Sequence, residues 1–342
     1  MIVFRVDGGS KCGVGHLVQC MAIAEQLRKR GFDTLFVVRE GVELLKDTDF
    51  PIISLDNVRF DIEELRILIK ILRKFDAKSL IVDLLDMSTE YSKYLWMHFK
   101  KPLIVIDYLG NKALYADIVI NGMISPYFHR YKRVLPSTKY YVGAKYMVLR
   151  EDFYIYHMRR KHIPSKCNNL LVCFGGADPT NITYKVVRLL INSDIDAKLS
   201  IIVGPAYQYT TKLVKLLNRD FCKQYELLIN VRKMAEVMYN ADIAVTTAGI
   251  TVYELATVGT PTLMVNRDYI NNITAEEFQR RGFGKNLGLA ANLSSNIFVE
   301  TVINLLEDRE TRKKMSVNGK KIVDSRGLWR VTNIIINTLE SN

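Results

Sequence analysis

The sequence predicts an α/β protein made of two successive doubly wound domains. Two observations carry this prediction. Short apolar runs alternate with amphipathic stretches along almost the whole chain, and one polar, basic stretch at 156–169 divides them into two series. Such alternation is typical of βαβ units, in which helices cover both faces of a parallel sheet. The length of 342 residues also suits two domains of about 100–200 residues each.

The first series is rich in Val and Ile. Its expected strands are 2–6, 34–38, 80–83, 103–107 and 117–121. Apolar residues recur at helical spacing in 16–30, and Gly31 follows as a stop signal. The stretch 61–75 repeats this helical pattern.

The second series follows the basic stretch. Its expected strands are 170–174, 199–203, 226–229, 243–246 and 262–265, with helices near 180–192, 206–218, 251–258 and 275–281. We therefore expect an N-terminal Rossmann-like domain over 1–155 and a C-terminal one over 156–342, the last helix being a candidate to pack back on the first domain. Because ligands bind at the carboxyl ends of parallel strands, the functional site is expected in a cleft between the two domains.

The composition excludes disorder and a membrane span. Hydrophobic residues make up 49% and charged residues 25% of the chain, and no apolar run reaches the ~18–20 residues that a span needs. The first strand contains Arg5 and ends at Asp7, unlike a secretory signal. The cysteines form no CxxC pair, which favours reduced thiols; they are Cys12, Cys20, Cys167, Cys173 and Cys222. We expect a cytoplasmic protein.

The net charge of +12 has three interpretations. A solvated basic surface is the simplest, since the basic runs are scattered and the run at 28–30 closes a predicted helix, where cations suit the dipole. A positive cleft would concentrate an anionic small substrate. Nucleic-acid binding would need basic residues on one face interleaved with aromatic ones, and we expect no nucleic-acid partner.

The densest motif runs from the end of the first strand into the first helix and reads Asp-Gly-Gly-Ser-Lys-Cys-Gly-Val-Gly-His over 7–16. Its glycines let the backbone bend and approach a ligand closely; they are Gly8, Gly9, Gly13 and Gly15. The loop leads to a helix N-terminus, whose amides favour an anion. A tight turn with packing glycines explains the motif equally simply. Asp7 and Lys11 add charged side chains to this loop.

His16 is expected in the first turn of that helix. A positive helix terminus disfavours imidazolium, so this histidine should be neutral near pH 7 and able to act as a general base. The alternative is a histidine that only hydrogen-bonds the loop. Cys12, His16 and Cys20 are spaced like metal ligands, but the glycines interrupt a helix through Cys12 and no fourth ligand is evident, so no metal is expected.

A second glycine motif, Gly175-Gly176-Ala177-Asp178-Pro179, again follows a strand. Asp178 followed by proline is typical of a helix N-cap, and capping alone could explain the segment.

A third motif, Thr247-Ala248-Gly249-Ile250, turns a strand into a helix whose exposed amides suit a diphosphate. Glu254, one turn further, could accept hydrogen bonds from ribose hydroxyls. The spacing from Thr251 to Glu254 is equally that of a capping box, in which the carboxylate only satisfies a backbone amide.

These motifs together resemble the nucleotide-sugar hydrolases of pseudaminic acid synthesis and the related spore-coat polysaccharide proteins, which are small relatives of the GT-B glycosyltransferases. The matching segments cover nearly the whole chain in order: Phe4-Arg5-Val6-Asp7, Gly13-Val14-Gly15-His16, Leu149-Arg150-Glu151-Asp152-Phe153, Gly175-Gly176-Ala177-Asp178, the block 248–265, Asn271-Asn272 and Gly282-Phe283.

The resemblance implies a GT-B-like fold and metal-free hydrolysis of a UDP-linked 2,4-diacetamido-2,4,6-trideoxy hexose to free sugar and UDP. It gives the catalytic role to His16, the sugar to the first domain and UDP to the second, with ribose near Glu254. The residues expected to contact the substrate are Asp7, Gly8, Gly9, Lys11, Gly13, Gly15, Arg150, Gly175, Gly176, Thr247, Ala248, Gly249, Ile250, Glu254, Asn271 and Asn272. No cofactor is implied, and we expect a monomer or weak homo-oligomer.

The chain departs from the family pattern at two strand ends. Family members commonly carry a tyrosine just after the aspartate that ends the strand expected here at 80–83. This chain has Leu84 and Leu85 after Asp83. A frequent Asp-Asp pair at the next strand end is Asp107-Tyr108 here. Two other functions stay open: a GT-B glycosyltransferase that passes the sugar to a hydroxyl acceptor, and a non-catalytic nucleotide-sugar-binding protein.

Overall fold

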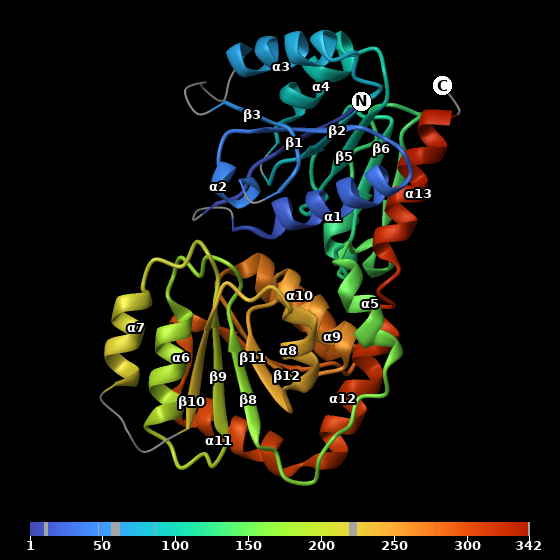
Figure 1. Ribbon diagram of the computed structural model, residues 1–342. Coiled ribbons are helices and arrows are strands. Elements are labelled where there is room, and N and C mark those ends of the chain that lie inside the picture. Colours follow the sequence, from blue (N-terminus) through green and yellow to red (C-terminus); the bar gives the residue numbers. More distant parts are fainter. Residues whose placement is uncertain (10–12, 47, 56–61, 86, 219–223, 341–342) are drawn as a thin grey trace. The chain divides into compact units, whose positions relative to one another are not determined.

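The computed structural model describes residues 1–9, 13–46, 48–55, 62–85, 87–218 and 224–340. These divide into two units (Figure 1). Unit 1 comprises residues 1–150 and 326–342, and unit 2 comprises residues 151–325. The chain thus leaves unit 1 after Arg150 and returns to it at Arg326.

Unit 1 contains a parallel sheet whose described strands follow the order β3-β2-β1-β4-β5-β6-β7. They are β1 (Ile2–Val6), β2 (Thr34–Val38), β3 (Ile52–Ser54), β4 (Ser79–Asp83), β5 (Leu103–Ile106), β6 (Ile118–Asn121) and β7 (Lys139–Val142). Its helical segments are α1 (Gly15–Lys29), α2 (Val42–Leu45), α3 (Ile62–Lys74), α4 (Thr89–His98), α13 (Gly327–Glu340), η1 (Pro126–His129) and η2 (Ala144–Tyr146).

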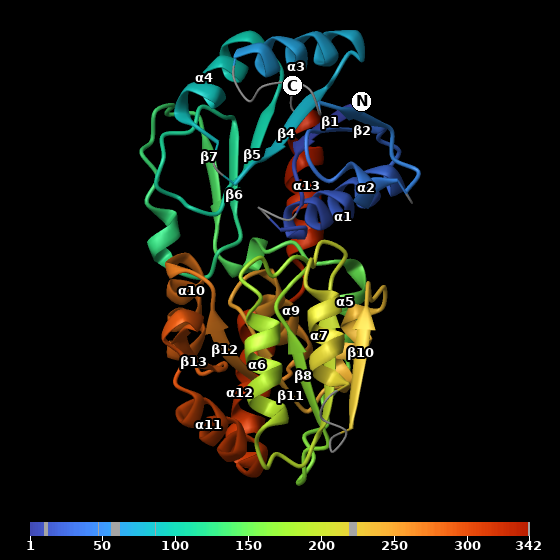
Figure 2. The same ribbon diagram turned by 90° about the vertical axis from the view of Figure 1, so that its left-hand side faces the viewer.

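Helices cover both faces of this sheet (Figures 1 and 2). Helices α3 and α4 lie on one face, where Leu68 and Leu95 join a buried cluster with Val3 and Leu80. Helices α1 and α13 pack against each other on the other face. The inner strands are buried along their whole length, which explains their unbroken apolar runs.

Buried charges interrupt the apolar interior of β1. The side chain of Arg5 is fully buried, and its Nε donates to Oε1 of Glu64 at 2.8 Å while its Nη1 donates to Oδ1 of Asp7 at 2.7 Å. The hydroxyl of Tyr91 donates to the same Glu64 oxygen at 2.8 Å. The arginine is therefore paired on both sides, as a buried charge must be.

Unit 2 contains a second parallel sheet, in which the described strands follow the order β10-β9-β8-β11-β12-β13. They are β8 (Asn169–Cys173), β9 (Lys198–Val203), β10 (Tyr225–Ile229), β11 (Ile243–Thr246), β12 (Thr262–Asn266) and β13 (Lys285–Leu289). The helical segments are α5 (Glu151–Met158), α6 (Ile182–Ile191), α7 (Thr210–Leu217), α8 (Met234–Asn240), α9 (Ile250–Val258), α10 (Tyr269–Arg280), η3 (Ala290–Asn292), α11 (Ser295–Glu307) and α12 (Arg309–Ile322).

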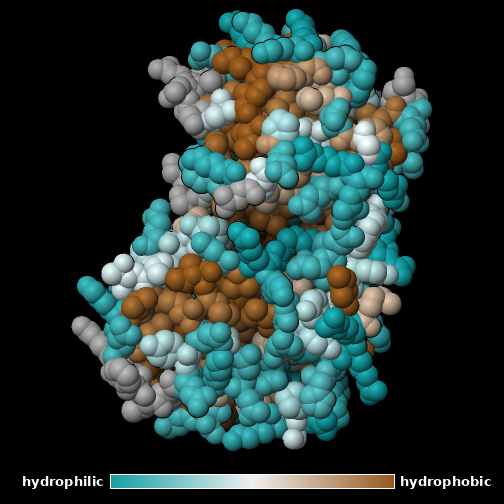
Figure 3. Space-filling view, viewed as in Figure 1, coloured by the Kyte–Doolittle hydropathy of each residue, from teal (hydrophilic) through white to brown (hydrophobic). Residues whose placement is uncertain are grey.

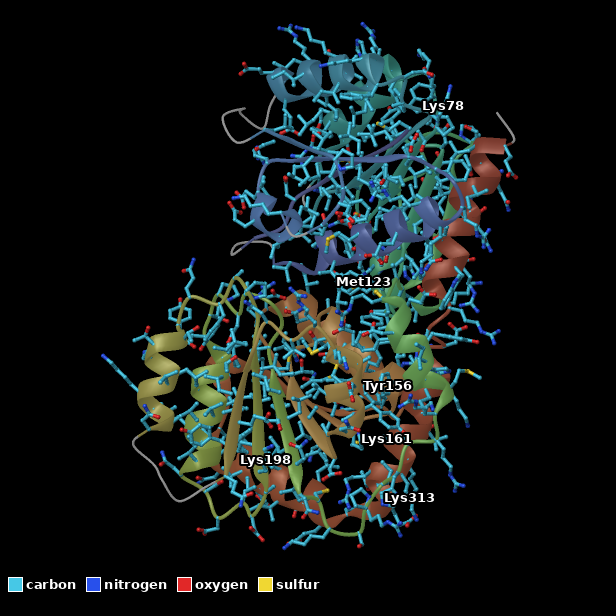
Figure 4. The ribbon with its side chains drawn as sticks, viewed as in Figure 1. Lys78, Met123, Tyr156, Lys161, Lys198 and Lys313 are labelled. Carbon is cyan, nitrogen blue, oxygen red and sulfur yellow. The ribbon has the colours of Figure 1, made fainter. Side chains whose placement is uncertain are left out.

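Helices α6, α7 and α11 cover one face of this second sheet, and α5, α8, α9 and α12 pack together on the other (Figures 1 and 2). The stretch after α5 is bound to unit 2. Nζ of Lys161, labelled in Figure 4, donates to the carbonyl of Ala241 at 2.6 Å and also to that of Tyr239. The predicted linker, 156–169, therefore begins in the last turn of α5 and continues as a segment attached to the unit 2 core.

These two parallel-sheet units confirm the predicted fold class. Each strand expected from the sequence is present, with ends that agree to within one residue. Strands β3, β7 and β13 were not predicted; their residues are partly exposed and lack an unbroken apolar run. Helix α6 begins at Ile182 and not at the expected 180, and α10 begins at Tyr269 and not at 275.

Hydrophilic residues are spread over the surface of both units. Figure 3 shows them in one view, together with an apolar area on each unit. Arg28 and Lys29 lie in the last turn of α1, as the interpretation of that basic run predicted. Within the described residues, no helix is both long enough and apolar enough to cross a membrane.

In each sheet the strand order reverses beside the first strand of the unit. The reversal lies between β1 and β4 in unit 1 and between β8 and β11 in unit 2. At such a point the connections from neighbouring strands run to opposite faces, which leaves a crevice at the carboxyl ends where α/β proteins bind ligands. The glycine motifs after β1, β8 and β11 all start at these reversals.

Candidate functional site

The loop from β1 to α1 is closed by its own backbone. Gly9 and Gly13 exchange two N–H···O bonds of 2.9 Å each, and Gly13 adopts the left-handed φ of +84° that suits glycine. The amide of Gly8 donates to the carbonyl of Glu40 at 2.9 Å. Gly15 begins α1, and Lys11 lies outside the described residues. The glycine motif thus delivers the chain to a helix N-terminus, as predicted.

Asp7 holds this loop to the end of β2. Its carboxylate accepts two hydrogen bonds from the Arg5 guanidinium, at 2.7 and 2.9 Å, and two more from the amides of Arg39 and Glu40, at 2.7 and 3.2 Å. Burial raises the pKa of Asp7, but Arg5 and the two amides outweigh it and lower the pKa below its usual range. Asp7 is therefore an ionised anchor of the loop, and its predicted contact with substrate stays a prediction.

His16 lies in the first turn of α1 and pairs with a carboxylate from another strand. Its Nδ1 is 2.7 Å from Oδ1 of Asp83, which ends β4 beside β1. Asp83 is 1% exposed and His16 is 9% exposed. Because a carboxylate only accepts hydrogen bonds, Nδ1 carries the proton, and the lone pair of the neutral ring lies on Nε2.

This pairing reverses the pKa shift that the helix terminus alone would give His16. The sequence predicted a neutral ring because it lies at a positive helix terminus. Burial does lower the pKa of His16, but the charge of Asp83 and its hydrogen bond outweigh burial, so that the pKa is raised above its ordinary 6.5. The helix terminus alone would lower this pKa, and the carboxylate that folding brings to the ring reverses that effect; the neutral ring near pH 7 stays a prediction.

Further polar groups gather around Asp83. The hydroxyl of Tyr108, which follows β5, is 3.3 Å from Oδ2 of Asp83 and also donates to Oε1 of Gln19 on α1. Sγ of Cys20 lies 3.6 Å from the same Oδ2. Cys20 therefore faces this carboxylate, while Cys12 lies outside the described residues. Sequence reasoning did not assign a role to Asp83, Tyr108 or Gln19, although Asp83 ends β4 at the reversal point.

In unit 2, the turn from β11 to α9 is held by asparagine side chains. Oδ1 of Asn266, the last residue of β12, accepts the amide of Ala248 at 3.1 Å. Asn271 on α10 donates to the carbonyl of Ala248 at 3.3 Å, and its Oδ1 accepts the hydroxyl of Thr247 at 3.4 Å. Helix α9 follows. Its N-cap residue is Gly249, which has no side chain that could cap the helix.

The capping-box interpretation of this motif is wrong. Helix α9 begins at Ile250, so Thr251 is already helical and is not the N-cap residue that the motif requires. Glu254 therefore does not occupy the capping position, and it is only partly buried. Its expected contact with ribose stays a prediction.

Three asparagines extend the network along the sheet edge. Nδ2 of the fully buried Asn266 donates to Oδ1 of Asn286 on β13 at 2.9 Å, and Nδ2 of Asn286 donates to Oδ1 of Asn272 at 3.0 Å. Sequence reasoning selected Asn272 but missed Asn266 and Asn286. The sequence did offer one signal for Asn266: it is a polar residue at the end of an apolar strand, and a buried polar residue needs hydrogen-bond partners.

The second glycine motif lies at the neighbouring strand end. Gly175 has a φ of +82°, and the carbonyl of Gly176 accepts the amide of Ala206 at 3.0 Å. Asp178 does cap α6, but from further away than predicted: its carboxylate accepts the amides of Ile182 at 2.9 Å and Thr183 at 2.7 Å. The helix therefore starts after Pro179 and not at it.

The predicted site residues thus form two groups, each within one unit. Asp7, Gly8, Gly9, Gly13, Gly15 and His16 lie at the β1 end of unit 1, whereas Gly175, Gly176, Thr247, Ala248, Gly249, Ile250, Glu254, Asn271 and Asn272 lie around the strand ends of unit 2. Arg150 is the last residue of the first segment of unit 1, directly before α5. Each group occupies the carboxyl edge of its own sheet.

Comparisons with known proteins identify relatives of this chain. Residues 170–325 match the glycosyltransferase family 28 C-terminal domain. The spore coat polysaccharide biosynthesis protein SpsG of Bacillus subtilis is 25% identical over 333 residues, which are 96% of each chain. The UDP-2,4-diacetamido-2,4,6-trideoxy-beta-L-altropyranose hydrolase of Campylobacter jejuni is 23% identical over 254 residues, 74% of this chain and 86% of that protein.

An uncharacterized protein of Methanocaldococcus jannaschii, MJ1062, is 26% identical over 291 residues; the match covers 82% of this chain but 58% of that longer protein. Among solved structures, MurG of Acinetobacter baumannii has the same fold, with a TM-score of 0.70 and 15% identity over 98% of this chain and 99% of that one. These matches support a two-domain GT-B fold and a glycosyltransferase-like enzyme class. The chain is thus similar to SpsG over 96% of its length and to the altropyranose hydrolase over 74%, and its fold is GT-B-like.

Proposed function

We propose that this protein is a metal-independent, cytoplasmic hydrolase of a UDP-linked diacetamido-trideoxy hexose, releasing UDP and free sugar for nonulosonic acid or surface polysaccharide synthesis. The single observation that carries the proposal is the His16–Asp83 pair at the carboxyl edge of unit 1, with 2.7 Å between Nδ1 and Oδ1. The similarity to a hydrolase of such a sugar nucleotide names the substrate class.

His16 acts as the general base. Asp83 keeps the proton on Nδ1, so Nε2 accepts a proton from water as the water oxygen bonds to C1 of the sugar. The bond between C1 and the diphosphate oxygen breaks, and its electron pair leaves with UDP. Because only the neutral ring is a base, and Asp83 raises its pKa, activity rises with pH through that raised pKa.

UDP is proposed to bind the turn before α9 in unit 2. Helix N-terminal amides stabilise the negative charge that develops on the departing diphosphate. Two hydrogen bonds hold this turn in place: the Ala248 amide donates to Asn266, and Asn271 donates to the Ala248 carbonyl. Glu254, in the first turns of α9, is the candidate partner of the ribose hydroxyls.

The replacement His16→Ala tests the base. UDP affinity should stay within about twofold of the wild type, because the nucleotide binds unit 2, whereas kcat should fall by ~10²–10⁴. UDP release from a panel of UDP-diacetamido sugars, without any acceptor, measures kcat, and calorimetric titration measures the affinity for UDP. Normal turnover by this variant would show that His16 is not the base.

A glycosyltransferase is the second candidate, favoured by the match of residues 170–325 to a glycosyltransferase domain. A hydroxyl acceptor would then take the place of water at C1, with the same base. A transferase releases UDP slowly until an acceptor is added, so the acceptor-free assay distinguishes the two. Tight UDP-sugar binding without any turnover would instead indicate a non-catalytic binding protein.

A further inference from the structure

Tyr108 contacts both members of the His16–Asp83 pair. It follows β5, two strands away from β1, and is 8% exposed. Its ring meets the imidazole of His16 edge-on, with 4.5 Å between ring centroids and 79° between ring planes. Its hydroxyl is 3.3 Å from Oδ2 of Asp83, whose other oxygen accepts Nδ1 of His16.

Gln19 fixes the position of that hydroxyl. Its Nε2 donates to the carbonyl of Val148 at 2.8 Å, which turns Oε1 towards Tyr108, where it accepts the phenol. Burial, and then the charge of Asp83, raise the pKa of Tyr108 well above its ordinary value, so the phenol keeps its proton. The hydroxyl therefore lies between two acceptors, one of which is itself held by the backbone.

These contacts restrict the catalytic pair in two ways. The edge of the phenol ring limits rotation of the imidazole, since an edge-to-face contact has a preferred geometry. The hydroxyl limits rotation of the Asp83 carboxylate, because it contacts Oδ2 while Nδ1 of His16 holds Oδ1. Both restrictions keep Nε2 aimed in one direction.

We propose that Tyr108 is a positioning residue, which holds Asp83 and the imidazole of His16 in the geometry that aims Nε2 at water. This inference rests on the proposed function for its catalytic meaning. Tyr108 acts through His16 and does not itself touch the substrate. A tyrosine that only filled the core would need its ring but not its hydroxyl.

The test therefore removes the hydroxyl alone, by Tyr108→Phe. The matched control is Tyr91→Phe, since Tyr91 is also buried, at 5% exposure, and also donates to a buried carboxylate, that of Glu64, at 2.8 Å. We expect kcat of Tyr108→Phe to fall about tenfold, which corresponds to the loss of one hydrogen bond to a charged group. KM should stay within about twofold of the wild type. Tyr91→Phe should keep the wild-type kcat.

A double variant separates positioning from general damage. In the His16→Ala background, Tyr108→Phe should cause no further loss of turnover, because the residue on which it acts is gone. An unchanged kcat in the single variant, or an equal loss with and without His16, would overturn the proposal.

If the protein hydrolyses no UDP-sugar, that result refutes the proposed function alone. A spectroscopic measurement then still tests the positioning role. The imidazole ¹⁵N resonances of His16 report which nitrogen carries the proton. They should shift towards a mixture of tautomers in Tyr108→Phe and stay unchanged in Tyr91→Phe. Unchanged His16 resonances in Tyr108→Phe would refute the positioning role.

Discussion

His16 and Asp83 are 67 positions apart in the sequence, yet Nδ1 of one lies 2.7 Å from Oδ1 of the other. The pair forms because β1 and β4 are adjacent parallel strands whose carboxyl ends coincide: Val6 is the register partner of Asp83. The loop after β1 then brings α1 back over that edge. The sheet reversal thus builds a histidine–carboxylate pair from two segments with no local relationship.

The replacement Asp83→Asn should change the pH dependence of turnover. An amide carries no charge, so the pKa of His16 falls, and the acidic limb of the kcat profile moves to lower pH. The plateau of kcat should also fall by about tenfold or more, because an amide can present either oxygen or nitrogen to the ring and no longer fixes its tautomer.

Steady-state rates of UDP release across the neutral range measure both effects. The matched control is Asp107→Asn. Asp107 directly follows β5, the strand next to β4, and accepts the hydroxyl of Tyr131 at 2.7 Å. An acidic limb that stays in place in Asp83→Asn would mean that His16 does not govern it.

Loss of the Asn266 side chain should weaken UDP binding. In Asn266→Ala the amide of Ala248 loses its 3.1 Å acceptor, and Asn286 loses a donor at 2.9 Å. The free energy of unfolding should fall by about 1–3 kcal/mol, as for other buried hydrogen bonds. The affinity for UDP should fall roughly tenfold, because the turn before α9 loses its hold.

Urea unfolding and calorimetric titration with UDP measure these two quantities. Thr260→Val serves as the control: the fully buried Thr260 donates to the carbonyl of Met238 at 2.6 Å, beyond the other end of α9. It should lose stability but keep its UDP affinity. Equal UDP affinity in both variants would place the nucleotide elsewhere.

Two glycines of unit 2 should respond oppositely to alanine. A Cβ at Gly204 would lie 2.4 Å from Cα of Gly176, so Gly204→Ala must push two backbone segments apart and lower the melting temperature. A Cβ at Gly249 meets no described atom within 4 Å, so Gly249→Ala should fold normally. It should nevertheless bind UDP more weakly, because the methyl group enters the space proposed for the diphosphate.

Thermal melts with and without UDP provide the comparison. The wild type and Gly204→Ala should both gain stability on adding UDP, each by its own affinity. If Gly249→Ala gains as much as the wild type, the diphosphate does not approach this turn.

A chelator should leave turnover unchanged. In the proposed mechanism, the amides at the start of α9 hold the charge of the departing diphosphate, and no step uses a metal ion. UDP release is measured before and after treatment with EDTA, with added Mg²⁺ as the comparison. Activity lost to EDTA and restored by Mg²⁺ would contradict the amide-only account.

The strands and the glycine loops were predictable, because buried parallel strands are apolar throughout and turns at their ends need small residues. The helix starts were less so. Asn181, with a left-handed φ of +54°, delays α6, while Asp178 reaches across to cap it from four residues before its first turn. A left-handed residue and a cap from four positions away are set by the folded loop, and the local sequence pattern gives little sign of them.

The partners of the candidate site residues were not predictable for the same reason. Asp83 is indistinguishable in sequence from any acidic residue that ends a strand, and only the strand order brings it to His16. Tyr108 and Gln19 meet only once β5 and α1 are both in place. The sequence therefore located the loops of the site but not the contacts that define its chemistry.

Helix α13 has a consequence for how the protein forms during translation. It packs on α1 with Leu328, Val331 and Ile335 buried, although it follows the whole of unit 2 in the chain. The ribosome therefore finishes unit 2 while one side of α1 is still uncovered. We expect nascent chains to pass through a stage in which the later unit is native while the earlier one still exposes the apolar face of α1 to chaperones.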